Sequence, residues 1–172
     1  MSHFSLKSGD IVMGDAAYGT AKNCAYVIKK GADFIFRITP SKFPIYDVMG
    51  SRIHRKMLLP VDKEKIKETL CLIKEKDTKG KIIKTHYVRV IVAKIPENKV
   101  KAAQKRKKAK AKKAETIQNA AYVFLVTSLT LTEESYGKEA IIELYRSRWQ
   151  IELLFKCFKQ NLGIKTIRIA SQ

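Results

Sequence analysis

The spacing of apolar residues at the start of the chain predicts a strand, a helix and a second strand. Ile11 to Met13 form a short apolar block that ends at Gly14 and Asp15. Residues 20–31 place apolar side chains at helical spacing, with Thr20 as the expected N-cap and Gly31 as the expected C-cap. Residues 33–39 alternate as a strand does, and Pro40 follows. This order is typical of a parallel α/β arrangement.

The pattern changes after residue 41 to short β-rich runs separated by polar turns. The runs are FPIYDV, KMLLPV, TLCLIKE and IIKTHYVRVIVAKI, at residues 43–48, 56–61, 69–75 and 82–95. Residues 77–80 have the composition of a hairpin turn. Residues 119–128 predict one more buried strand. We therefore expect a small antiparallel sheet inserted into an α/β domain.

A long amphipathic helix is expected from about Tyr136 to Leu162, ending at Gly163. At about 100° per residue, four of its polar side chains fall within roughly 60° of one another. These are Tyr145, Arg148, Glu152 and Lys159. The neighbouring stripe, expected to be buried, is apolar and consists of Leu144, Ile151, Leu154, Phe155, Phe158 and Leu162. This helix would present a carboxylate between cations and a phenol.

The net charge of the chain indicates what kind of molecule it binds. The chain has 35 Lys and Arg against 16 Asp and Glu, a net charge of +19. Such an excess favours a polyanion, with nucleic acid the first choice and an anionic membrane surface the weaker one. Residues 99–115 predict a helix rich in lysine that binds phosphates, including Lys105, Arg106, Lys107 and Lys108. The alternative is a solvated helix that contacts nothing.

The sequence also indicates the cellular location of the protein and whether it spans a membrane. No apolar run has the length of a membrane span, and the first ten residues lack the apolar centre of a signal peptide. The three cysteines are far apart, so we expect them to be reduced and buried. These observations predict a cytoplasmic protein.

Two acids are candidates for metal binding. Asp15 follows the first predicted strand, at the edge where open α/β sheets bind ligands, and Glu152 lies on the long helix. Paired carboxylates suit Mg²⁺, Arg148 suits a phosphate, Lys159 adds a point charge and Tyr145 a hydrogen-bond donor. Each residue also has a simpler interpretation: Asp15 as a cap, Glu152 as an ion-pair partner of Arg148, and Tyr145 as core. From the residues alone, this is a basic α/β protein that binds nucleic acid.

The arrangement Tyr145-x2-Arg148-x3-Glu152-x6-Lys159 resembles the Y-R-E-K signature of bacterial insertion-sequence transposases of the DDE group, of the type of insertion sequence number four. The stretch GDAAYGT resembles the segment around that group's second catalytic aspartate, which would be Asp15, although Ala16 stands where many relatives have arginine. The resemblance implies an α/β fold, with a partial ribonuclease H-like core (residues 1–40 and 129–172) interrupted by a β-rich insertion (residues 41–128).

The resemblance also implies a function. Two divalent metals, Mg²⁺ or Mn²⁺, would be held by Asp15 and Glu152, and Tyr145, Arg148 and Lys159 would bind transposon-end DNA. In some relatives an aromatic residue of the insertion stacks on a flipped base, which points to Tyr122 or Phe124.

One departure from the family concerns its first catalytic aspartate, which lies well upstream of the second, whereas only fourteen residues precede Asp15 here. The resemblance therefore indicates the C-terminal part of a catalytic domain, with two of three carboxylates. We expect such a chain to be inactive alone and to self-associate or to need an N-terminal part. The alternatives are a non-enzymatic nucleic-acid-binding module and an oligomerising fragment without activity.

Overall fold

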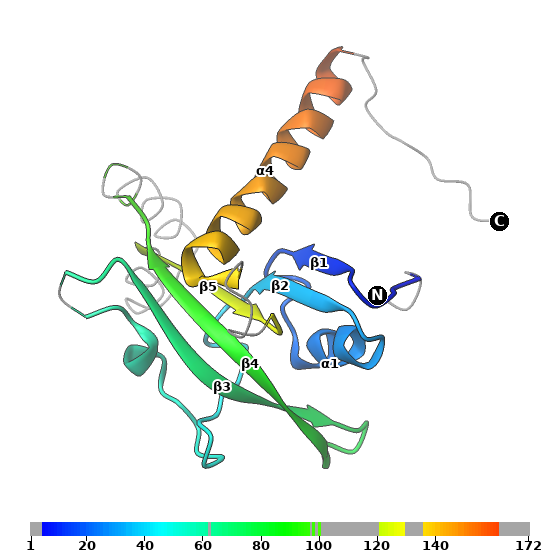
Figure 1. The fold of residues 1–172 in the computed structure, drawn as a ribbon, viewed down its shortest axis with the longest axis vertical. Helices are drawn as coiled ribbons and strands as arrows, with labels where there is room; N and C mark the ends of the chain where they lie inside the picture. Colours follow the sequence, from blue (N-terminus) through cyan, green and yellow to red (C-terminus); the bar gives the residue numbers. More distant parts are fainter. Residues whose placement is uncertain are drawn as a thin grey trace.

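A five-stranded sheet forms the centre of the protein in a computed structural model, which describes residues 5–61, 63–96, 98, 100, 121–129 and 136–161. The strands lie in the order β1-β2-β5-β4-β3 (Figure 1). β1 (Ile11–Gly14) and β2 (Asp33–Arg37) are parallel. All other neighbours are antiparallel, namely β5 (Tyr122–Thr127), β4 (Ile82–Lys94) and β3 (Ile66–Lys76). The predicted α/β class is confirmed, and the strands of the β-rich segment extend the same sheet as β1 and β2.

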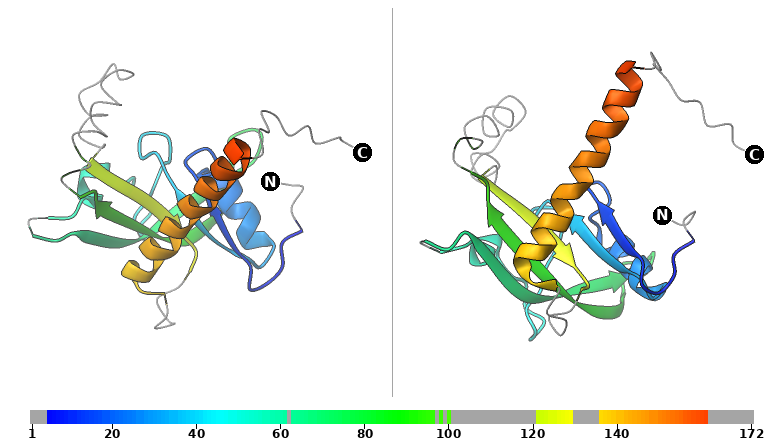
Figure 2. Two further views of the ribbon diagram at one scale, coloured as in Figure 1. Left: turned by 90° about the horizontal axis from the view of Figure 1, so that it is seen from above. Right: turned by 45° about the horizontal axis from the view of Figure 1, so that its top comes forward.

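Alternation along the strands gives the sheet two apolar faces. On β2, Phe34 and Phe36 belong to the core cluster beneath α1 (Ala21–Lys29), whereas Ile35 points to the opposite face. That opposite face is covered by the first half of α4 (Lys138–Asn161), whose Ile141 is fully buried. The two helices thus lie on opposite faces of one sheet (Figure 2).

The predicted N-cap of α1 is confirmed, and the C-cap is Lys30, one residue before the predicted Gly31. The Thr20 hydroxyl accepts a hydrogen bond from the Asn23 amide at 3.2 Å. At the other end Gly31 has a φ of +72°, and its amide donates to the Ile28 carbonyl at 3.0 Å. The next amide, of Ala32, donates to the Val27 carbonyl at 3.3 Å, so a Schellman motif ends the helix.

Two of the predicted β-rich runs are not strands. In residues 43–48 only Tyr46 forms isolated bridges, with Arg52 and Leu72. Residues 55–58 form a 3₁₀ helix, η1 (Arg55–Leu58), because the His54 side chain caps it through the Lys56 amide. Pro60 follows and lacks the N–H that a sheet ladder needs. The predicted hairpin is confirmed: β3 and β4 pair over their whole length across the turn at residues 77–80.

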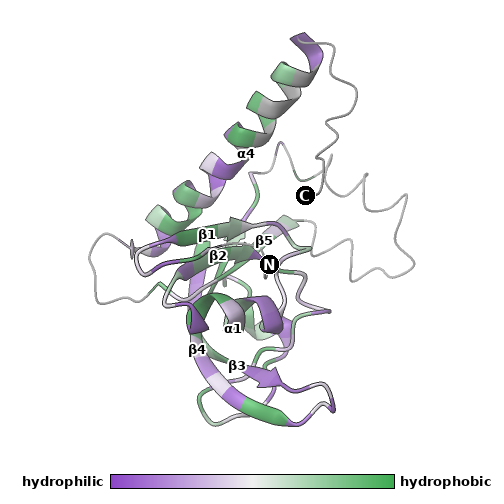
Figure 3. Ribbon diagram, turned by 90° about the vertical axis from the view of Figure 1, so that its right-hand side faces the viewer, coloured by the Kyte–Doolittle hydropathy of each residue, from purple (hydrophilic) through white to green (hydrophobic). Residues whose placement is uncertain are grey.

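The expectation that the apolar stripe of α4 is buried was wrong for its second half. Ile151, Leu154 and Phe158 are 50%, 56% and 51% exposed, because this half of the helix extends beyond the sheet (Figure 3). For the same reason Cys157 is exposed, whereas Cys24 and Cys71 are buried as expected.

Some predictions fall outside the described residues. They include the basic residues Lys105 to Lys108, the helix end at Leu162 and Gly163, and the apolar stretch that follows. Within the described part of the chain, none of the helices has the length and apolarity that crossing a membrane requires.

Candidate functional site

Asp15 and Arg37 lie side by side at the carboxyl ends of the two parallel strands. Gly14 pairs with Phe36 in the β1–β2 register, so the residues that come next are Asp15, just after β1, and Arg37, the last residue of β2. Oδ1 of Asp15 accepts a hydrogen bond from the Ala17 amide at 2.9 Å, which leaves Oδ2 open to another ligand. The predicted capping role of Asp15 and a role at the sheet edge are therefore compatible.

Two glycines bring this loop against β2. A Cβ at Gly14 would lie 2.9 Å from the Phe36 ring, and one at Gly19 would lie 2.2 Å from the Arg37 carbonyl oxygen. Only glycine permits the loop to approach the Phe36 side chain and the Arg37 backbone so closely. The loop that carries Asp15 is therefore held tightly against the end of β2.

Helix α4 brings Tyr145 and Arg148 to the same end of the sheet. The Cζ atom of Arg148 lies 5.3 Å from the centroid of the Tyr145 ring. Burial raises the pKa of the Tyr145 hydroxyl, the positive charges of Arg148 and Arg37 oppose the rise, and Asp15 adds to it. Apart from Arg148, no described residue is a hydrogen-bond partner of the buried Tyr145 oxygen. Residues from β1, β2 and α4 therefore form one electrostatically coupled group.

A buried arginine holds the start of α4 in place. Arg89 of β4 is 3% exposed and pairs with Glu68 of β3. Its Nη1 donates to the carbonyl oxygens of Leu129 and Tyr136, both at 2.9 Å. Because these carbonyls lie at the end of β5 and just before α4, Arg89 sets the point from which the helix crosses the sheet.

The structure places three of the predicted site residues close together and does not describe the side chains of two others. Asp15, Tyr145 and Arg148 come together, while Glu152 and Lys159 lie on α4 with side chains outside the described set. Glu152 lies four residues, or about one turn, after Arg148, which is about 6 Å further along the axis of α4. Phe124, one of the two aromatic residues considered for stacking on a base, is 3% exposed and belongs to the core.

Sequence reasoning missed Arg37. The available signal was a cationic residue directly after the apolar run Phe34 to Phe36, in a strand expected to lie parallel to the first one. Tyr122 is partly buried against the core, and no finding tests its predicted role.

Asp15 is the candidate metal ligand among the described side chains of the site. Among the described residues, no three His, Cys, Asp or Glu side chains form a cluster able to hold a metal ion. Asp15 still offers a carboxylate oxygen at the sheet edge, which is an oxygen ligand of the kind that Mg²⁺ prefers. A metal site here would need at least one further carboxylate, and Glu152 is the predicted one.

The fold and this group define an α/β protein with an acidic residue and two arginines at the carboxyl edge of its sheet. Residues 2–172 match the family described as "Transposase DDE domain", and the chain belongs to this family. The predicted resemblance to insertion-sequence transposases is thereby confirmed.

Curated relatives agree with the family assignment. The chain is 29% identical over 182 residues to the "Putative transposase InsL for insertion sequence element IS186A" of Escherichia coli strain K12, covering 98% of this chain and 47% of the relative. The same figures hold for the "Transposase for insertion sequence element IS421" of Escherichia coli. A third relative, the "Transposase for insertion sequence element IS231C" of Bacillus thuringiensis subsp. berliner, is 25% identical over 174 residues, covering 93% of this chain and 36% of the relative. The chain thus spans about half or less of these relatives.

Proposed function

We propose that this chain is the part of an insertion-sequence transposase that binds transposon-end DNA and supplies two carboxylates, Asp15 and Glu152, for metal-dependent strand cleavage and transfer. The observation that carries the proposal is the meeting of Asp15, Arg37, Tyr145 and Arg148 at one sheet edge. It comes from three elements of a chain with a net charge of +19.

Each residue has a role that its chemistry supports. Arg148 binds a phosphate through its planar guanidinium, and Arg37 adds positive charge from the end of β2. Tyr145, whose pKa is raised by burial, stays protonated and donates a hydrogen bond. Lys159 adds a further cation along α4. Asp15 and Glu152 would hold Mg²⁺ or Mn²⁺, which when bound activates water and stabilises the leaving oxygen.

We further propose that cleavage needs a third carboxylate from outside these 172 residues, so that this chain alone is inactive. One structural feature supports a partner segment. β1 is an edge strand of the sheet, paired only with β2 among the described strands. Unpaired strand edges favour association with another strand, supplied by an N-terminal part or by a second copy.

DNA binding by the α4 face is tested with two arginine variants of one helix. Arg148→Ala removes the cation beside Tyr145, whereas Arg146→Ala removes the same charge from an exposed side chain that pairs with Glu143 at 3.0 Å. Fluorescence anisotropy with a labelled end-sequence duplex should show about tenfold weaker binding for Arg148→Ala and little change for Arg146→Ala. Equal losses in the two variants would contradict the role of this face.

Metal binding is tested by a matched pair of aspartates that flank β1. Asp10 precedes β1 and accepts a hydrogen bond from the Lys7 amide, at the end opposite Asp15. Electron paramagnetic resonance of Mn²⁺ in the presence of duplex DNA should show weaker binding for Asp15→Asn and for Glu152→Gln. Asp10→Asn should bind as the wild type does, and a loss as large as that of Asp15→Asn would sink the assignment.

The net charge favours a second candidate, a non-enzymatic nucleic-acid-binding module. Such a module would bind unrelated duplexes as tightly as end-sequence DNA, with an equally steep dependence on salt. It would also remain inert when an upstream segment that carries a third carboxylate is added, whereas a transposase segment would then nick end DNA in Mg²⁺ and lose this activity in Glu152→Gln.

A further inference from the structure

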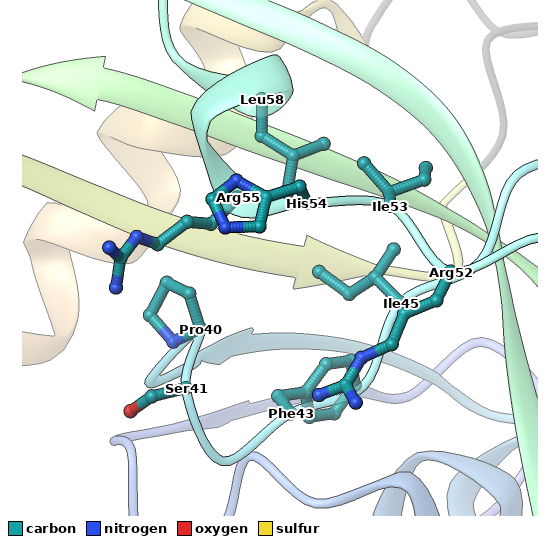
Figure 4. Close-up of a pocket in the computed structure, with 9 residues that line it drawn as sticks. All are labelled: Pro40, Ser41, Phe43, Ile45, Arg52, Ile53, His54, Arg55 and Leu58. Carbon is teal, nitrogen blue, oxygen red and sulfur yellow. The ribbon is translucent and has the colours of Figure 1, made fainter.

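A cavity of about 370 Å³ opens in the segment that follows β2. Its floor is apolar, since Phe43, Ile45 and Leu58 are at most 3% exposed. Its rim is cationic, with Arg52 and Arg55 extending in different directions from one segment (Figure 4). Among the described residues, none of those that line it is acidic. A hollow of this kind suits an anion with an apolar part attached.

Two rim residues can donate hydrogen bonds into the cavity. Nδ1 of His54 accepts from the Lys56 amide at 3.5 Å, so the other ring nitrogen, Nε2, carries a hydrogen and is a donor. No described residue forms a hydrogen bond or an ion pair with the exposed guanidinium of Arg52. The rim thus offers an imidazole ring beside a cation, and both can donate hydrogen bonds to phosphate oxygens.

The position of the cavity links it to the sheet edge. Pro40 on its rim follows Arg37 by three residues, so their Cα atoms are at most about 11 Å apart. A DNA strand held at Arg37 is therefore within reach of the cavity rim. The floor residues belong to the core on the α1 face of the sheet. A DNA strand that enters the cavity from the sheet edge would therefore lie on the face opposite α4.

We infer that this cavity is a subsite for the DNA strand whose end is held at Asp15 and Arg37, binding a backbone phosphate at the Arg52 and His54 rim and its sugar over the apolar floor. The inference rests on the proposed function and adds to it a second, separate point of contact. It assigns to residues 40–58 a role in DNA binding that their irregular backbone, with one 3₁₀ helix and isolated bridges, does not reveal.

The experiment compares two cations of the same segment in the 172-residue chain. Arg52→Ala removes a rim cation, whereas Lys56→Ala removes an exposed cation that does not line the cavity. Anisotropy with the labelled duplex should show at least fivefold weaker binding for Arg52→Ala and less than twofold for Lys56→Ala. The slope of log affinity against log salt should fall by about 0.9, as expected for one lost phosphate contact. Arg52→Lys should recover most of the affinity.

The outcomes separate this inference from the proposed function. If Arg148→Ala weakens binding and Arg52→Ala behaves as Lys56→Ala does, the subsite is absent although the transposase assignment stands. If the wild type does not bind duplex DNA, the proposed function fails first. If Arg52→Ala lowers the affinity for inorganic phosphate and leaves DNA binding unchanged, the cavity takes free anions and the inference is overturned. Equal thermal midpoints of the variants serve as the folding control.

Discussion

Replacing Arg89 by methionine removes the cation that joins β4 to the start of α4. The change leaves the Glu68 carboxylate and the carbonyl oxygens of Leu129 and Tyr136 without their donor. Breaking one partner of a buried ion pair costs about 3–5 kcal/mol. For a chain of this size each kcal/mol lowers the melting temperature by about 2–4 °C. We therefore expect Arg89→Met to melt on the order of 10 °C below the wild type.

The measurement is thermal and urea unfolding followed by circular dichroism. Lys84→Met is the matched control, since Lys84 is an exposed cation on the same strand and its loss should change stability by less than about 0.5 kcal/mol. The double variant Arg89→Met with Glu68→Met should recover the part of the loss that is due to the unpaired carboxylate. If Arg89→Met unfolds within about 1 kcal/mol of the wild type, the buried pair does not hold α4, and the reasoning is refuted.

Three further outcomes follow from single positions. Gly19→Ala should lower stability by about 1–3 kcal/mol and weaken DNA binding, because its Cβ meets the end of β2, whereas Gly137→Ala, with nothing nearer than 3.9 Å, should not. The hydrogen bond from Lys29 holds the pKa of Glu75 below its ordinary value of 4.5, so this carboxylate stabilises the fold above that pH and stops doing so as the pH falls through its folded pKa. Glu75→Gln should therefore lower the melting temperature at neutral pH, with a difference from the wild type that shrinks on acidification. A native thiol titration at about pH 8 should count one reactive cysteine, Cys157, because burial raises the pKa of both other thiols, that of Cys71 to about 12.

The sequence predicted those local structures that depend on residues adjacent in the chain. The Thr20 cap, the turn at Gly31 and the hairpin at residues 77–80 depend on a few adjacent residues, and all three were predicted. The two runs around Tyr46 and Leu58 were wrongly predicted to be β-rich. Their apolar residues reach the core from irregular backbone, so an apolar run was mistaken for a strand.

The candidate site shows a similar division. Asp15, Tyr145 and Arg148 were identified from spacing and resemblance, and they do lie together. Arg37 and the Arg89 pair were missed, since their importance depends on which strands are neighbours. The register of β1 with β2 places Arg37 beside Asp15, and β4 lies close to the start of α4 only through the sheet order.

By itself the sequence determined the class of fold, the family and the helix that carries the signature residues, because periodicity and spacing are properties of the chain. Tertiary structure decided which face of that helix meets the sheet. The sequence pattern favoured burial of the Leu144 and Ile151 stripe, yet Ile141 is fully buried and Ile151 is half exposed. The physical reason is that a helix buries only the residues that lie over its sheet. Its first half crosses the sheet with Tyr145 and Arg148 at the edge, and its second half extends beyond it.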